Sequence, residues 1–368
     1  MSEPRVDRIL VIATRQIGDV LLTTPMMQAA QRRWPHARID VLGFAGTLGM
    51  LRGQPFVHEL IEVQPRAGWR AAWALARRLW RRYDLALITQ QSDRAHLYGL
   101  IAAPVRSGLV PERRSISWWK RLLLRHAVTI DDEGTPTVQE KLALLDPWRL
   151  DRARPEVAPP PGEPLPAEIE RQLVGAPVVV HVPSMWSYKQ WPMRHFREVI
   201  EALLARGHQV LLTGSGSEVD QAQVAEVRDV GTAPALIDVS GRLSLAQVAT
   251  LLARAALYVG PDTSITHLAA AIGTPTVTVF GPTNPVRWGP WPRGAAPDEA
   301  WVRQQPRQQV GRVIMLQAEQ ACIACGRAGC DDSRESRSAC LDATPPSRVI
   351  QECLAVLDAA AEKETARP

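Results

Sequence analysis

Residues 258–271 read YVGPDTSITHLAAA, and residues 273–285 continue with GTPTVTVFGPTNP. The apolar runs at 257–259 and 276–280 predict two buried strands, and the residues at 265–272 predict a helix between them. A Gly-Pro turn and a short polar run separate the first strand from the helix. This order of strand, turn, helix and strand is typical of a parallel α/β sheet.

The same alternation extends through the rest of the chain. In the second half, further strands are predicted at 177–183, 209–213 and 236–239, with helices at 195–206 and 245–254. In the first half, strands are predicted at 8–13, 38–43, 58–63 and 84–89, with helices at 20–34 and 67–82. Because strands that alternate with helices pair in parallel, each half predicts a doubly wound α/β sheet.

A proline-rich stretch separates the two halves. Residues 152–166 read RARPEVAPPPGEPLP, which is typical of an extended linker. We therefore predict four parts: an N-terminal domain (1–150), a linker (151–176), a C-terminal domain (177–345) and a C-terminal helix and tail (346–368). Two such sheets are expected to face each other across a cleft at their carboxyl ends, where open α/β folds bind ligands.

The charge of the chain is unevenly distributed. Residues 1–130 hold 20 Lys and Arg against 9 Asp and Glu, whereas the remainder holds 23 against 29. A basic first half favours an anionic partner, such as a phosphorylated glycolipid or an anionic membrane, and a solvated arginine-rich surface is the alternative. Nucleic acid is not expected, because no helix-turn-helix, RNP or zinc-finger pattern accompanies the charge.

The sequence also bears on where the protein is expected to reside. Its N-terminus, which includes Glu3 and Asp7, lacks the pattern of a secretory signal. No stretch approaches the roughly 18 uninterrupted apolar residues that a spanning helix needs. A cytoplasmic location is therefore expected.

Polar residues at the start of the 265–272 helix predict an anion site. Asp262, Thr263 and Ser264 follow a strand directly, so that hydroxyls, backbone N–H groups and the helix dipole favour phosphate there. His267 lies in the first helical turn. The alternative is an ordinary capping run.

Two further loops follow strands at the same predicted edge. Residues 182–192, VPSMWSYKQWP, contain Ser184 and Lys189, and a lysine in such a loop can reach a diphosphate. Glu218 follows the strand at 209–213 and can accept hydrogen bonds from ribose hydroxyls. A solvated lysine and a glutamate at a helix N-terminus are the alternatives.

One carboxylate follows the first strand of the chain. Asp19 comes after Gly18 in IGDVLLTTP, between the first strand and the first helix. It can take a proton from an acceptor hydroxyl, or it can simply cap the helix. The GxGxxG fingerprint is absent, which argues against an NAD enzyme.

Four cysteines lie within 19 residues near the end of the second domain. Cys322, Cys325, Cys330 and Cys340 belong to CIACGRAGCDDSRESRSACL, whose spacing matches no standard zinc-ribbon or ferredoxin pattern. Three interpretations stay open: a structural metal site, a redox disulfide, and a structural loop of packed thiols. Cys353 is expected in a helix core.

A basic aromatic segment stands out in the first half. Residues 113–125 read RRSISWWKRLLLR, and Trp69, Trp73 and Trp80 precede them. These residues could form a face that rests on a membrane surface, with core packing of the tryptophans as the alternative. The predicted acceptor or membrane face comprises Arg113, Arg114, Trp118, Trp119, Lys120 and Arg121.

Three motifs in this order resemble the ADP-heptose:lipopolysaccharide heptosyltransferases. They are IGDVLLTTP at 17–25, KQWP at 189–192 and GPDTSITHLAAAIGTPTVTVFGPTNP at 260–285. The resemblance covers nearly the whole chain. The Cys-rich segment looks like the branch that includes heptosyltransferase III. The chain differs at Ser264, where many relatives have Gly and a Cβ restricts how closely a ligand approaches.

The resemblance implies a fold and a reaction. The family has the GT-B fold, two Rossmann-like domains facing across a cleft, and inverting transfer of heptose from ADP-L-glycero-D-manno-heptose to the lipopolysaccharide inner core without a metal ion. It implies that the first domain binds acceptor, the second binds donor, and Asp19 is the catalytic base. Its donor-binding residues fall on Lys189, Asp262, Thr263 and His267, with Ser184 and Glu218 placed by position.

The expected partners are therefore ADP-heptose, a lipopolysaccharide core and, peripherally, the cytoplasmic face of the inner membrane. No cofactor is expected beyond a structural metal at the cysteines. Two alternatives are kept: a GT-B transferase that uses UDP-N-acetylglucosamine or ADP-glucose, and a non-catalytic metal or redox module built on a degenerate transferase scaffold.

Overall fold

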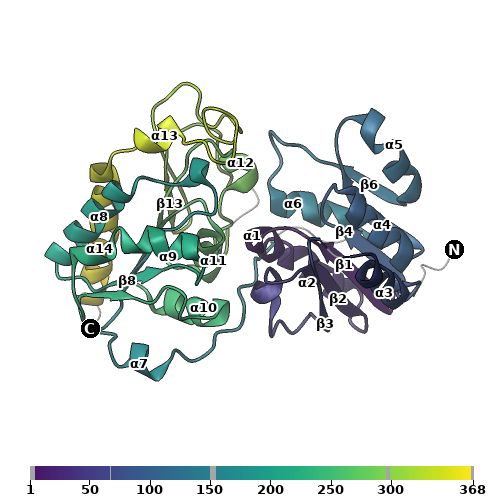
Figure 1. Ribbon diagram of the computed structural model, residues 1–368, viewed down its shortest axis with the longest axis horizontal. Helices are drawn as coiled ribbons and strands as arrows, with labels where there is room; N and C mark the ends of the chain where they lie inside the picture. The colour runs from purple at the N-terminus through teal and green to yellow at the C-terminus, as the bar shows by residue number, and fades with distance from the viewer. Residues whose placement is uncertain (1–4, 67, 150–154, 296–298, 366–368) are drawn as a thin grey trace. The chain divides into compact units, whose positions relative to one another are not determined.

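The computed structural model describes residues 5–66, 68–149, 155–295 and 299–365. The chain divides into two compact units, Met1–Pro161 and Gly162–Pro368 (Figure 1). The division falls within the segment 151–176, of which residues 151–154 lie outside the described residues. Each unit has its own sheet and its own hydrophobic core.

Unit 1 is built on a six-stranded parallel sheet in the order β3-β2-β1-β4-β5-β6. Its strands are β1 (Arg8–Ala13), β2 (Arg38–Phe44), β3 (Glu59–Val63), β4 (Leu85–Ile88), β5 (Val105–Val110) and β6 (His126–Thr129). The central strands are apolar because helices cover both faces of a parallel sheet. The order reverses between β1 and β4, as in a doubly wound fold.

The crossovers of unit 1 place helices on both faces of its sheet. One face carries α1 (Ile17–Leu21), α2 (Thr24–Arg33) and η1 (Leu48–Leu51). The next connections run in the opposite direction along the sheet, so right-handed crossovers put α3 (Trp69–Leu79), α4 (Asp93–Ala102) and α5 (Arg114–Leu123) on the other face. There α4 lies between α3 and α5 (Figure 1). Finally, α6 (Thr137–Leu142) and η2 (Ala143–Trp148) pack against α2.

Unit 2 contains a seven-stranded sheet in the order β12-β13-β11-β10-β7-β8-β9, with only β12 antiparallel to its neighbour. Its strands are β7 (Val178–His181), β8 (Val210–Thr213), β9 (Leu236–Asp238), β10 (Leu257–Pro261), β11 (Thr276–Val279), β12 (Arg307–Val310) and β13 (Val313–Leu316). The order reverses between β7 and β10. Both units therefore have the predicted doubly wound α/β architecture.

Unit 2 contains eight α-helices within the described residues, some of which pack directly on its sheet. They are α7 (Ala167–Glu170), α8 (Met193–Ala205), α9 (Glu218–Ala225), α10 (Leu245–Arg254), α11 (Ser264–Ile272), α12 (Pro285–Trp288), α13 (Ala339–Asp342) and α14 (Pro346–Thr365), with short turns η3 (Ser187–Lys189) and η4 (Arg228–Val230). The last helix, α14, packs on α8, β10 and β11 and places Cys353 in the core, as expected. Among the described helices, none combines the length and apolar character needed to cross a bilayer.

The prediction of one helix over 20–34 is wrong. The segment forms α1 and α2, because the hydroxyls of Thr23 and Thr24 donate to Val20 O (2.5 Å) and Leu21 O (2.8 Å) at the end of α1. Pro25 then occupies the first turn of α2, where its missing N–H costs nothing.

Candidate active site

The residues predicted to act on ligands follow the strands at which each sheet order reverses. In unit 1, Asp19 follows β1, which neighbours β4. In unit 2, Ser184 and Lys189 follow β7, and Asp262 follows β10. Ligands of open α/β sheets bind outside the carboxyl ends of the strands at such a switch point. The topology of each unit thus places these side chains where the fold binds ligands.

Lys189 and Asp262 form an ion pair across the switch point of unit 2. Lys189 Nζ lies 2.6 Å from Asp262 Oδ2, and the two side chains are 22% and 6% exposed. Burial acts to raise the pKa of Asp262, but the charges of Lys189 and His267 and hydrogen bonds from Lys189 and Thr283 hold this pKa below its ordinary value. The carboxyl group is therefore ionised at neutral pH and fixes the position of the ammonium group.

The N-terminus of α11 lies beside this pair. Thr263 is the N-cap residue, with extended backbone and no side-chain cap bond, and Ser264 is the first helical residue. Two contacts of Thr266 stabilise the turn that precedes α11. Its Oγ1 donates to Pro261 O (2.5 Å) and lies 2.9 Å from the Tyr258 hydroxyl. His267 is buried in the first turn of α11. A helix start without a capping side chain can offer its N–H groups to an anion.

The loop that carries Lys189 is anchored by Gln190 and Trp191, which the sequence alone did not single out. Trp191 is fully buried, packs edge-on against Phe196 with ring centroids 4.9 Å apart, and donates from Nε1 to Thr344 O (3.1 Å). Gln190 donates to Val182 O (3.1 Å) and to Trp191 O (2.8 Å). In the KQWP motif, Lys189 is therefore the candidate ligand-binding residue, and Gln190 and Trp191 fix the main chain of the loop that carries it.

The Cys-rich segment and the residues after it support the same loop. The Arg334 guanidinium lies 4.6 Å from the centre of the Trp186 ring, and Ser338 Oγ donates to Tyr188 O (2.7 Å). Together with the bond from Trp191 to Thr344, these contacts join 186–191 to a part of the chain about 150 residues later.

Ser184 and Glu218 are placed differently from each other. Ser184 is buried, its N–H donates to Gln190 Oε1 (2.9 Å) and Gln223 Oε1 (3.1 Å), and its hydroxyl donates to Trp186 O (3.2 Å). Ser184 thus shapes the Lys189 loop. Glu218 is exposed as the first residue of α9, while its neighbour Asp220 accepts from the Ser215 N–H (2.8 Å).

In unit 1, Asp19 lies in the first turn of α1, and Gln16 is the N-cap residue. The interpretation of Asp19 as a helix cap is therefore excluded. Its carboxylate is 17% exposed and lies 3.5 Å from Arg15 Nε. The buried Lys141 of α6 donates to Asp19 O (2.6 Å), which fixes the backbone of α1 at this point. Asp19 thus has a fixed backbone and a carboxylate that is partly accessible to solvent.

Lys141 and Gln90 belong to this edge of unit 1 but were missed in the sequence. Gln90, just after β4, donates to the hydroxyl of Thr14, just after β1, and so bridges the switch point. Lys141 reaches Asp19 from 122 residues away. No local pattern marks either residue: Gln90 meets Thr14 because β4 lies beside β1, and Lys141 meets Asp19 from α6.

The basic aromatic segment forms α5, and its residues divide into two groups. Trp118 is 60% exposed, and Arg113 and Arg114 are exposed at the start of the helix. Lys120 is buried, donating to Gln91 O and pairing with Asp93 at 2.6 Å each, while Trp119 packs edge-on against His96. Arg121 donates to the Thr129 hydroxyl (3.1 Å). Lys120 and Trp119 therefore hold α5 in place, and Trp118 faces outward.

The thiols of the Cys-rich segment differ in their environment. Cys322, Cys325 and Cys330 are exposed, and Cys340 is buried. Burial, and then the nearby thiols of Cys325, Cys322 and Cys330, raise the pKa of Cys340 to about 11. Within the part of the chain that the structure describes, no three His, Cys, Asp or Glu side chains are grouped as ligands of one metal ion.

The Lys189–Asp262 pair should show strong energetic coupling. Lys189→Met leaves a buried carboxylate with less compensating charge, so we expect a loss of about 2 kcal/mol in the free energy of unfolding. Asp262→Asn in the same chain removes that charge, and the double variant should lose clearly less than the sum of the single losses. Urea denaturation of the four proteins measures this. The exposed pair Arg254–Glu170 is the control, and its two single variants should show no resolvable coupling energy. Additive losses of unfolding free energy at Lys189 and Asp262 would contradict the expectation.

The cysteines should separate by reactivity. With a thiol reagent at mildly alkaline pH, Cys322, Cys325 and Cys330 should react quickly in the native protein. Burial raises the pKa of both Cys340 and Cys353, so these two should react only on unfolding. Mass mapping of labelled peptides assigns each thiol. Rapid native labelling of Cys340 would count against the structure, and protection of the exposed three that a chelator removes would reveal a bound metal.

Known proteins resemble this chain in both sequence and fold. The family model described as glycosyltransferase family 9 (heptosyltransferase) matches residues 72–309. Lipopolysaccharide heptosyltransferase 3 of Escherichia coli is 29% identical over 287 residues, which cover 74% of this chain and 83% of that protein.

Solved structures extend the likeness to nearly the whole chain. The E. coli ADP-heptose lps heptosyltransferase II matches with a TM-score of 0.72 at 22% identity, covering 96% of this chain and 99% of the other. A glycosyl transferase family 9 protein from Veillonella parvula matches with a TM-score of 0.75 at 17% identity, covering 97% and 98%. These structures confirm the predicted GT-B fold. Because the family model spans well over half of the sequence, the chain belongs to glycosyltransferase family 9, the heptosyltransferases.

Proposed function

We propose that this glycosyltransferase transfers heptose from ADP-L-glycero-D-manno-heptose to the lipopolysaccharide inner core, with inversion at the anomeric carbon. Family membership and the likeness to lipopolysaccharide heptosyltransferase 3 support the substrate class. The structural observation that carries the proposal is the ion pair between the partly exposed Lys189 and the buried Asp262 at the switch point of unit 2, beside the start of α11. This arrangement suits a nucleotide diphosphate.

In the proposed reaction, unit 2 holds the donor diphosphate. An ammonium group has three N–H donors, and Lys189 is partly exposed, so it can bind Asp262 and a phosphate oxygen together. The N–H groups at the start of α11 and the hydroxyls of Thr263 and Ser264 supply further donors. These groups stabilise the negative charge that grows on ADP as it leaves.

Asp19 of unit 1 is the proposed base. The oxygen of the acceptor hydroxyl bonds to the anomeric carbon, the bond from that carbon to the diphosphate oxygen breaks, and ADP leaves with the electron pair. Asp19 takes the proton of the hydroxyl. Arg15 Nε lies 3.5 Å from this carboxylate, and Lys141 positions the backbone of Asp19.

The test is transfer to lipopolysaccharide cores truncated at successive inner-core positions, read by mass spectrometry. We expect a gain of one heptose on one truncated core with ADP-heptose as donor. Transfer only from UDP-N-acetylglucosamine or ADP-glucose would replace the proposed donor. The absence of transfer from every donor to every core would refute the reaction and favour a non-catalytic role of the scaffold.

Asp19→Asn should separate chemistry from binding. Because the amide cannot take the proton, turnover should fall by at least about 100-fold, while the affinity for ADP-heptose changes little. Steady-state kinetics and calorimetric donor titration measure the two effects. Asp7→Asn is the matched control, since Asp7 is an exposed carboxylate of the same unit that pairs with Arg5 at 2.9 Å. An equal loss of donor affinity in Asp19→Asn would exclude the proposed role.

We further propose that unit 1 makes peripheral contact with the cytoplasmic face of the inner membrane through α3, α4 and α5. Twelve large apolar side chains are exposed in the described chain, and eight of them belong to these helices or directly follow α3. They are Trp69, Trp73, Trp80, Leu97, Leu100, Ile116, Trp118 and Leu122. Core packing therefore does not explain these tryptophans.

The charge on these helices fits an anionic bilayer. α3 (WRAAWALARRL) and α5 (RSISWWKRLL) contain basic but no acidic residues. Guanidinium groups lie over exposed indoles, with Arg77 4.7 Å from the ring centre of Trp73 and Arg70 5.3 Å from that of Trp69. Exposed tryptophans between basic residues are typical of helices that lie in a membrane interface.

Removing two of the indoles should weaken membrane binding. For Trp73→Ala with Trp118→Ala, we expect about tenfold weaker binding to vesicles that contain phosphatidylglycerol, with an unfolding midpoint close to wild type because both side chains are exposed. Vesicle co-sedimentation measures the binding. Val219→Ala with Val302→Ala removes exposed apolar groups from unit 2 and is the control. Equal behaviour of the two double variants would rule out this face.

A further inference from the structure

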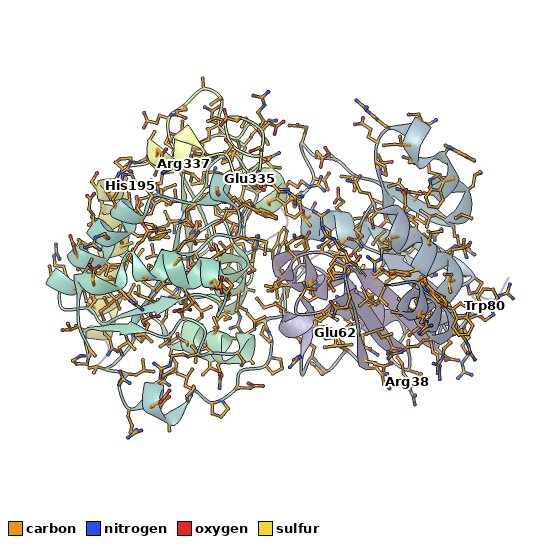
Figure 2. The ribbon with its side chains drawn as sticks, viewed as in Figure 1. Arg38, Glu62, Trp80, His195, Glu335 and Arg337 are labelled. Carbon is orange, nitrogen blue, oxygen red and sulfur yellow. The ribbon has the colours of Figure 1, made fainter. Side chains whose placement is uncertain are left out.

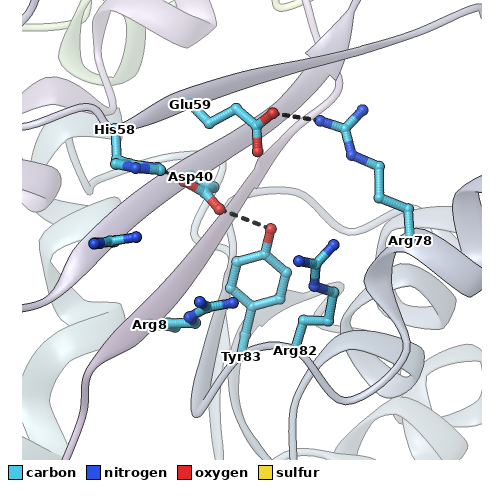
Figure 3. A pocket seen from close by; sticks show the side chains of 8 residues that line it. Arg8, Asp40, His58, Glu59, Arg78, Arg82 and Tyr83 are labelled. Atoms are coloured by element: carbon cyan, nitrogen blue, oxygen red, sulfur yellow. Dashed lines mark hydrogen bonds and ion pairs between the residues drawn. The ribbon is translucent and has the colours of Figure 1, made fainter.

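A small cavity rich in arginine lies at the amino edge of the unit 1 sheet. It measures about 150 Å³ and is lined by Arg8, Arg38, Asp40, His58, Glu59, Arg78, Arg82 and Tyr83 (Figure 3). Arg8, Arg38 and Glu59 are the first residues of β1, β2 and β3. Asp19 follows the opposite, carboxyl end of β1. The cavity is therefore distinct from the proposed transfer site.

Strand register explains why like charges gather here. Arg8 of β1 pairs with Arg38 of β2, so their side chains lie on the same face of the sheet. Asp40, two residues after Arg38, lies on that face as well. Further along, Leu10, Ile12 and Leu42 continue the same face into the core beneath α3 and α4. Arg78 of α3 and Arg82 and Tyr83 after it close the cavity.

The carboxylates of the cavity already have partners. Asp40 Oδ1 lies 2.9 Å from His58 Nδ1, and Asp40 Oδ2 accepts from the Tyr83 hydroxyl at 2.9 Å. Burial and the neighbouring Asp40 raise the pKa of Tyr83, so its hydroxyl remains a donor. Glu59 accepts from Arg78 at 2.6 Å. Beside the cavity, Asp84 accepts from the backbone N–H groups of Asp7 and Arg8.

The remaining guanidinium groups are the unusual feature. Arg8, Arg38 and Arg82 form no side-chain hydrogen bond or ion pair within the described residues. Four arginines thus line the cavity with two carboxylates, and both carboxylates are engaged. These arginines are exposed, so water screens part of their mutual repulsion, and a bound anion would offset the remainder. Guanidinium groups bind phosphate oxygens with two parallel N–H bonds, which makes phosphate the matching anion.

We propose that this cavity binds a phosphate group through Arg8, Arg38 and Arg82, at a site separate from sugar transfer. Its position favours the phosphate of a membrane lipid. Trp80, which directly follows α3 and precedes Arg82 by two residues, is 64% exposed and lies at the surface of unit 1 in Figure 2. If the Trp80 indole lies in the membrane–water interface, the nearby arginines of the cavity lie at the level of the lipid headgroups. A soluble phosphate compound shares the same chemistry, and the experiment separates the two sources.

The first arm uses inorganic phosphate and needs neither donor nor acceptor, so it is independent of the transfer reaction. Phosphate should raise the unfolding midpoint of the wild-type protein above that in chloride of equal ionic strength. Arg8→Gln with Arg38→Gln should weaken phosphate binding about tenfold by calorimetry. Arg52→Gln removes an exposed arginine of the same unit outside the cavity and should leave binding unchanged. Circular dichroism of the apo proteins checks that each variant is folded.

The second arm uses phosphatidylcholine vesicles that carry phosphatidic acid or phosphatidylserine at matched surface charge. A wild-type preference for phosphatidic acid that the cavity variant loses and Arg52→Gln keeps identifies a lipid headgroup. Phosphate binding without that preference identifies a soluble phosphate and still supports the site. No binding of inorganic phosphate by the wild type, or equal weakening by Arg52→Gln and the cavity variant, overturns the proposal.

Discussion

Parallel pairing is the constraint on which both units depend. Parallel strands require crossovers, and the crossovers cover both faces of the sheet with helices. The strands between the helices are therefore apolar except at their ends, as in β1, β4, β7 and β8, where only the end residues Arg8, His181 and Thr213 are polar. Polar and charged side chains therefore gather at the amino and carboxyl ends of the strands. In unit 1 the carboxyl edge holds Asp19, and the amino edge holds the arginine cavity. The two proposed ligands, an acceptor hydroxyl at Asp19 and a phosphate at the arginine cavity, are thus assigned to opposite ends of the same strands.

The sequence predicted the buried, regular parts of this fold well. Apolar runs such as 8–13, 177–183 and 276–280 identify strands directly, because burial on both faces leaves no other composition. Three of the four strands that were missed lack this signal, whereas β13 (VIML) has it and was overlooked. β5 (VRSGLV) contains polar residues and Gly, β6 (HAVT) has four residues, and β12 (RQQV) is a polar antiparallel edge strand. Their strand state depends on neighbours that no local pattern reveals.

The candidate site divides in the same way. Asp19, Lys189, Asp262 and Thr263 follow strands in recognisable motifs, and the strand order places each at a switch point. Lys141 and Gln90 complete the edge of unit 1 through contacts between distant segments, so the sequence offered no signal for them. Thr283 lies in the quoted 260–285 motif, but its hydrogen bond to Asp262 depends on the fold. The basic aromatic segment was ambiguous for a related reason. Periodicity places Trp118, Trp119 and Lys120 on one helix, but only the packing of α5 on α4 decides which of them is exposed.

Two hydrogen bonds, one between Ser338 and Tyr188 and one between Trp191 and Thr344, have a consequence for the order of folding. They join residues 150 and 153 positions apart, and α14, which completes the same core, lies at the end of the chain. During synthesis β7, β8 and β10 emerge long before those partners. The Lys189 loop can therefore reach its final geometry only after the C-terminal segment has been made and packed. Nascent chains that lack these partners would contain β7, β8 and β10 without the bonds that fix the Lys189 loop, so this loop is expected to become ordered late in synthesis.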